Sequence, residues 1–141
     1  MLVFKSDDGK AAMIRLEQGE DLYDDITRGV RDLGIEAGTV QVIGGLTHAR
    51  FAYYNQERKE YEEHEFPGGS EIASCVGNVS IKDGEPFLHA HLVVSGPDGR
   101  AVGGHLLPGS KVFLAEVYLR QLGGEAPVRK VDETLGLPVW S

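Results

Sequence analysis

The sequence has little cysteine and no long apolar stretch, and both shortages limit what the chain can be. Its 141 residues include one cysteine, Cys75, which excludes an internal disulfide framework and any zinc site built from several cysteines. The first ten residues lack the apolar region of a signal peptide, and no run approaches the roughly 18 apolar residues of a membrane-spanning helix. We therefore expect a cytoplasmic protein without a membrane segment.

Positive charge is also scarce. The chain carries 14 Lys and Arg against 22 Asp and Glu, a formal net charge of −8. Because an acidic surface repels phosphate backbones, such a chain is a poor candidate for nucleic-acid binding. Neither G-x-G-x-x-G nor G-x-x-x-x-G-K-[ST] occurs, so the glycine-rich loops that hold nucleotide phosphates are absent as well.

Glycine, by contrast, is abundant: 19 residues, which predicts many tight turns and short strands. Residues 19–34 predict one main helix, capped by Asp21 and ended by Gly34. Its apolar residues recur at helical spacing: Leu22, Ile26, Val30 and Leu33. Strand-like runs occupy 2–6, 10–16, 39–46, 49–54, 71–81, 86–95, 100–107 and 111–121. The pattern predicts a single compact α+β domain over residues 1–141: a mostly antiparallel sheet, one main helix and room for a second short one.

The sequence also predicts the local structure of three further segments. The Gly44-Gly45 pair suggests a bend or bulge between two strands. The charged run 55–66 predicts a solvated hairpin tip followed by a short edge strand. Near the end of the chain, we expect Trp140 to pack back onto the domain.

Three of the five histidines fall within seventeen residues. His89 and His91 are two apart in an apolar run, so on a strand their side chains project from the same face. Residues 97–99, Pro-Asp-Gly, suit a three-residue hairpin loop with glycine in the left-handed position. With that loop His91 faces His105 directly, whereas a two-residue loop would turn His105 to the opposite face.

Histidines that face one another across strands lie close enough to share one divalent metal ion. Three neutral imidazoles suit zinc, with iron, manganese and nickel as alternatives, and they leave a coordination position open for a small ligand. The competing interpretation is that His89, His91 and His105 merely share a half-exposed sheet face. His48 and His64 lie in polar or charged surroundings, where we expect surface side chains.

Two carboxylates come next as candidates. Glu116 stands alone in the apolar run VFLAEVYL, and Glu71 precedes another apolar run. Each is either a partner or general base beside the histidines or an outward-facing strand residue. Cys75 is expected to be a small core residue.

Taken together, residues 19–54 and 77–117 resemble the Plants and Prokaryotes Conserved (PPC) domain family in its stand-alone prokaryotic form. The spacing of PFLHAH and the later GGHL is the most specific part of the match. The resemblance implies an antiparallel sheet flanked by helices, a homotrimer, and a metal site at His89, His91 and His105. Plant relatives join this domain to AT-hooks, but the present chain has no Arg-Gly-Arg-Pro hook.

Three functions follow as hypotheses. The first is a small cytoplasmic homotrimer with a three-histidine metal site, with or without enzymatic activity. The second is a DNA-associated or protein-interaction module, as the plant relatives imply. The third is a cupin-like metalloenzyme, which the sequence disfavours because no acidic residue follows the His-x-His pair before Asp98.

Overall fold

Turns rich in glycine divide the chain into nine strands and a single helix. The computed structural model describes residues 1–141. Its elements are β1 (Leu2–Lys5), β2 (Ala11–Leu16), α1 (Leu22–Asp32), β3 (Gly38–Asn55), β4 (Glu60–Lys82), β5 (Glu85–Ser95), β6 (Ala101–Leu106), β7 (Lys111–Gln121), β8 (Val128–Asp132) and β9 (Leu137–Trp140).

The predicted α+β class is wrong, because the structure is mainly β. Strands make up 63% of the residues and the helix only 8%, and no second helix forms. Outside α1 the apolar residues alternate with period two and many are β-branched, which favours strands. Residues 123–141, which carried no clear pattern, supply the hairpin β8–β9.

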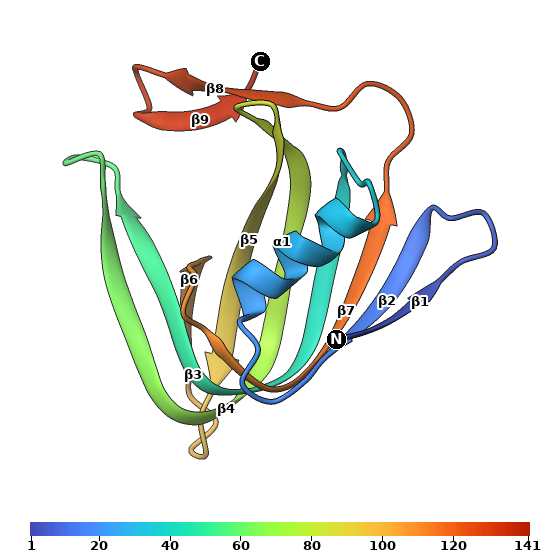
Figure 1. Cartoon of the computed structure of the whole chain (residues 1–141). Helices are drawn as coiled ribbons and strands as arrows, with labels where there is room; N and C mark the ends of the chain where they lie inside the picture. The colour runs from blue at the N-terminus through green and yellow to red at the C-terminus, as the bar shows by residue number, and fades with distance from the viewer.

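One sheet contains all nine strands, in the order β1-β2-β7-β3-β6-β5-β4-β8-β9. Neighbours are antiparallel except β4 and β8, which run parallel. Because β3 also pairs with β4, the strands β3, β6, β5 and β4 form a closed ring of hydrogen-bonded neighbours. The predicted irregularity at Gly44-Gly45 is confirmed by shifts of register there. Figure 1 shows the β8–β9 hairpin running across the ends of β4 and β5.

The helix covers one face of this sheet (Figure 1). Asp21 caps it as predicted, accepting hydrogen bonds from the backbone N–H groups of Tyr23 and Asp24. Gly34 follows the helix with a φ of 66°, a conformation that glycine adopts without strain. Ile26 and Val30 are fully buried against the sheet. At 11 residues, this one helix is too short to cross a membrane.

Two local expectations need correction. The hairpin tip at residues 55–60 forms as predicted, but the strand that follows is the 23-residue β4 rather than a short edge strand. Its first part pairs with β3 alone, which explains the solvated pattern of its charges. Trp140 does not pack into the domain, since 54% of it is exposed.

Candidate metal centre

The loop between β5 and β6 sets the register that brings the histidines together. Gly99 has a φ of 74° and donates its N–H to the carbonyl of Gly96 at 3.0 Å, as the three-residue loop requires. His91 consequently stands directly opposite His105 in the ladder. The convergence predicted from the turn residues is confirmed.

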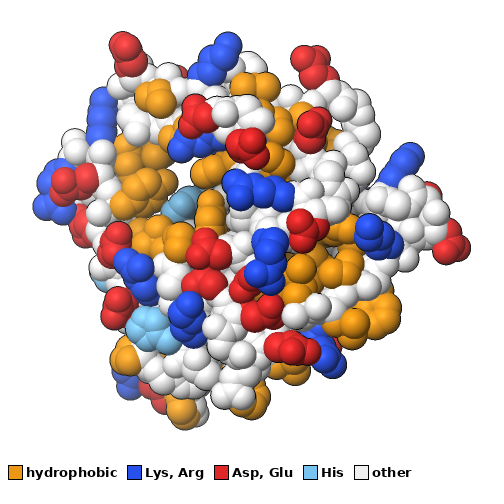
Figure 2. Space-filling view, in the orientation of Figure 1, with side chains coloured by type: hydrophobic (Ala, Val, Ile, Leu, Met, Phe, Trp, Pro, Cys, Tyr) orange, Lys and Arg blue, Asp and Glu red, His pale blue; other side chains and the backbone are white.

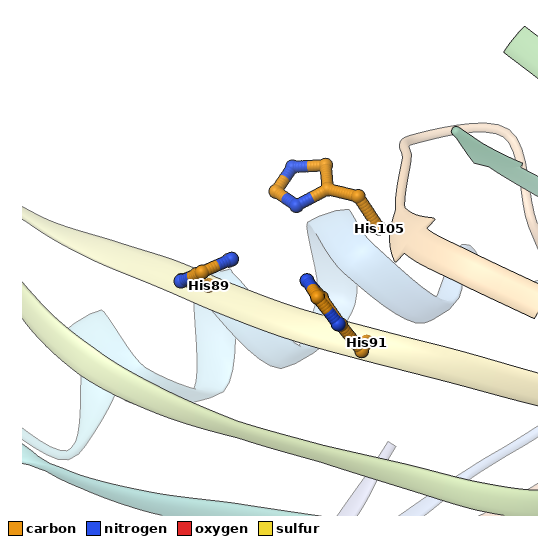
Figure 3. A group of neighbouring side chains, drawn as sticks. All are labelled: His89, His91 and His105. Atoms are coloured by element: carbon orange, nitrogen blue, oxygen red, sulfur yellow. The ribbon is translucent and has the colours of Figure 1, made fainter. Parts of the chain in front are cut away.

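The three imidazoles, which we call the histidine cluster, form a compact triangle (Figure 3). His89 and His91 project from β5 and His105 reaches toward them from β6. Their potential ligand nitrogens all lie within 4.8 Å of one another, and the ring centroids are 5.1 to 5.9 Å apart. Zinc bonds to histidine are about 2.0–2.1 Å long, so small side-chain rotations would bring all three nitrogens onto one ion.

Consecutive glycines let β6 approach its two neighbours closely at this point. A Cβ atom on Gly103 would overlap the carbonyl oxygen of Leu92 in β5, and one on Gly104 would overlap that of Ala52 in β3. Only glycine fits between backbones at such spacing. The glycines therefore hold His105 at the height of the histidines on β5.

Burial favours the uncharged form of two of the three histidines, His105 and His89. It lowers the pKa of His105 to about 4, and the nearby His89, His91 and Arg129 shift it in the same direction. The pKa of His89 is also lowered, first by burial and then by the charge of Arg129. Neutral imidazole is the form that binds a metal ion, so both side chains are ready to bind at neutral pH.

One nitrogen of the cluster lacks any protein partner. The Nδ1 atom of His105 is buried and makes no hydrogen bond, although buried polar atoms are almost always paired. A metal ion held by the cluster would satisfy this atom or reorient its ring. The three imidazoles of the cluster therefore provide the nitrogen donors that a divalent ion such as zinc requires.

The cluster lies in a hollow of about 620 Å³. The ring of Tyr61 packs against His105 in a tilted arrangement with centroids 5.0 Å apart, and the ring of Tyr54 packs against Tyr61 in the same way at the same distance. The β8–β9 hairpin closes another side with Pro138 and Val139. In Figure 2 a histidine side chain is recessed between hydrophobic groups. We call this space the histidine hollow.

Arg129 on β8 ties that hairpin to the cluster. Its guanidinium donates to Ser80 Oγ at 2.7 Å, to the carbonyl of Pro138 at 2.9 Å and to Asn78 Oδ1 at 2.9 Å. It also lies 3.4 Å from Nδ1 of His89. Arg129, Tyr54 and Tyr61 could not be assigned to the site from the sequence, because they reach it through pairings between distant segments that leave no local motif.

The two candidate carboxylates do not join the cluster. Glu116 lies exposed on β7, opposite Arg15 and Ile43. Glu71 lies exposed on β4 and contributes to a different surface depression. Neither lines the histidine hollow.

The remaining histidines also lie elsewhere. His64 is exposed and stacks on Phe51. His48 is half-buried, with its Nε2 atom 3.9 Å from a carboxylate oxygen of Glu65. Neither belongs to the group of side chains that could share an ion.

The family comparison and two solved structures point to one family. A model of the Plants and Prokaryotes Conserved domain matches residues 4–123. The crystal structure of a metal-containing protein from Archaeoglobus fulgidus is 42% identical, with a TM-score of 0.89, covering 100% of this chain and 99% of that one. A plant- and prokaryote-conserved protein from Pyrococcus horikoshii is 36% identical, with a TM-score of 0.88, covering 99% and 94%.

A curated relative is much longer. The bifunctional protein GlmU of a Synechococcus strain is 32% identical over 108 residues, which are 75% of this chain. The match spans only 16% of that relative's own length. The likeness therefore concerns one segment of a larger protein.

Proposed function

Because the chain belongs to the Plants and Prokaryotes Conserved domain family, we propose that it is a metal-binding protein of that family. In this proposal His89, His91 and His105 hold one divalent ion. The supporting observation is the cluster itself: three imidazoles converge, and the buried Nδ1 of His105 has no protein partner. The metal-containing relative from Archaeoglobus fulgidus, similar over the whole chain, points the same way.

We propose zinc as the ion, with iron, manganese and nickel as the alternatives that imidazole ligands also accept. Three neutral ligands leave the ion a position for water or a ligand, and a bound ion of this kind acts as a Lewis acid. His89, His91 and His105 hold and orient it, while Tyr61 shields one side of His105 from water. No carboxylate lines the histidine hollow, so we propose metal and ligand binding and assign no reaction.

The assembly and compartment belong to the same proposal. We propose a homotrimer, supported by open sheet edges at β1 and β9 and by large apolar side chains on the sheet surface. Phe4 pairs with Met13, and Met13 pairs with Tyr118, and all three are exposed. A reducing cytoplasmic setting suits the single unpaired Cys75.

Metal titration tests the site directly. We would strip the purified protein with a chelator and titrate Zn²⁺, Fe²⁺, Mn²⁺ and Ni²⁺ by calorimetry, with metal analysis of the protein as purified. We expect one ion per chain and at least a tenfold loss of affinity when any of the three histidines is changed to Ala.

His48→Ala and His64→Ala are the matched controls, because they remove imidazoles outside the cluster. Both should bind metal as the wild type does. Equal affinity in the wild type and His91→Ala would contradict the proposal.

A further inference from the structure

The charge of the histidine hollow differs from the charge of the molecule. The whole chain carries a net charge of −8, yet no aspartate or glutamate lines this hollow. Two cationic side chains, Lys82 and Arg129, do line it. A bound divalent ion would add to this local positive charge.

Neither cation has an acidic partner. Lys82 and Arg129 form no ion pair, and each instead lies over the ring of Phe87, at 5.1 and 5.3 Å from its centroid. Most other basic residues of the protein do pair with carboxylates, among them Arg28, Arg50, Arg58 and Lys111. A charge left without its counter-ion beside a hollow favours an anionic ligand there.

Arg129 keeps donor capacity for such a ligand. A guanidinium has five N–H groups, and its donations to Ser80, Pro138 and Asn78 account for three of them. The nearby Nδ1 atom of His89 accepts no further N–H when that neutral imidazole binds the ion, since it has only one free lone pair. One of the two remaining N–H groups belongs to Nη1. Because the other contacts fix the guanidinium, a ligand would pay little conformational entropy to use it.

The residues that line the hollow suit the apolar part of an organic ligand. Tyr54, Tyr61, Phe87 and Leu137 present aromatic and aliphatic surface, and the volume of about 620 Å³ lies within the range usual for small-molecule sites. An inorganic anion would leave this apolar surface in contact with water. An anion with an apolar or aromatic part would cover it.

We propose that the histidine hollow binds a small organic carboxylate, with its charged group between Arg129 and the metal and its apolar part against the tyrosines. The inference rests on the proposed metal site, because the open coordination position provides the second anchor for the carboxylate. Arg129 is the orienting residue and Lys82 adds longer-range attraction.

Simple probes test this ligand class. Acetate, benzoate, acetamide, benzamide and inorganic phosphate would be titrated calorimetrically into the zinc-loaded and the metal-stripped protein. We expect benzoate to bind more tightly than acetate, both amides and phosphate to bind at least tenfold more weakly than benzoate, and metal removal to weaken benzoate at least tenfold. With Co²⁺ in place of zinc, benzoate should change the visible absorption of the ion.

Variants identify the groups that recognise the charge. Arg129→Gln should weaken benzoate about 10- to 100-fold, as loss of a hydrogen bond to a charged group does, and Arg129→Lys should recover part of the loss. Lys82→Gln, which breaks no hydrogen bond, should weaken it a few-fold. Lys130→Gln removes an exposed charge from the same strand and should leave benzoate binding unchanged.

The two proposals fail in different ways. If zinc binds to the histidines but benzoate and benzamide bind equally, or neither binds, the carboxylate site is refuted and the metal site stands. The same holds if phosphate binds more tightly than benzoate. Failure of zinc itself to bind would overturn both.

Discussion

His105 is held in its uncharged form by its surroundings, and this has a consequence for stability. Its pKa falls from 6.5 to about 4 on folding, chiefly because of burial. Between these two values the unfolded chain binds a proton at this residue that the folded chain does not. The free energy of unfolding therefore decreases as the pH falls through this window and shows no further change from this group below about 4.

We predict that the metal-free protein loses stability between pH 7 and pH 5, and that His105→Gln loses less. Each kcal/mol lost lowers Tm by about 2–4 °C in a chain of this size, so thermal unfolding in the presence of a chelator resolves the difference. His64→Gln, at an exposed histidine, should follow the wild type. Parallel pH profiles for wild type and His105→Gln would contradict this explanation.

Strand β6 depends on its glycines for its place between β5 and β3. We predict that Gly103→Ala destabilises the fold by about 1–3 kcal/mol, since the new methyl group overlaps the backbone of β5. It should also weaken metal binding more than tenfold, because β6 carries His105. Gly69→Ala in β4 meets no atom within 4 Å and should change stability by less than about 0.5 kcal/mol. Chemical denaturation and metal titration compare the two variants, and equal effects would refute the close-packing argument.

The same elements show how far a sequence can be interpreted. The turn at residues 97–99 and the cap at Asp21 were predictable, because a few adjacent residues determine each conformation. The residues that line the histidine hollow around the three histidines were not predictable from the sequence. Arg129 reaches it only because β8 pairs in parallel with β4 at Ile81 and Lys82, a contact between segments more than forty residues apart. The strands at residues 128–132 and 137–140 were not predicted for the same reason, since their pairing partners rather than a local pattern determine them.

At the scale of the whole molecule, self-association is the first prediction. Sedimentation at micromolar concentration should give a mass near three times 15.3 kDa. Met13→Glu places a charge in the exposed apolar row and should shift the protein toward monomer. Gln18→Glu adds the same charge at an exposed turn and should leave the trimer intact. A wild-type monomer at every concentration would refute the trimer.

Nucleic-acid binding should be weak. With 22 acidic against 14 basic side chains, few phosphates can be neutralised, so we predict a Kd for duplex DNA weaker than about 100 µM at physiological salt. Fluorescence anisotropy with labelled duplexes, repeated at several salt concentrations, measures this. Tight and sequence-selective binding of duplex DNA would contradict this prediction.

All three histidines of the cluster lie on one hairpin, β5–β6, whereas the ring of strands to which this hairpin belongs joins segments far apart in the chain. Ala52 pairs with His105, and pairings of such range form slowly, on a scale of milliseconds to seconds. A three-residue loop closes far sooner, because its entropic cost is small. During refolding, His91 and His105 would meet before the ring is complete. An ion bound at that moment would serve as a nucleus around which the distant strands assemble.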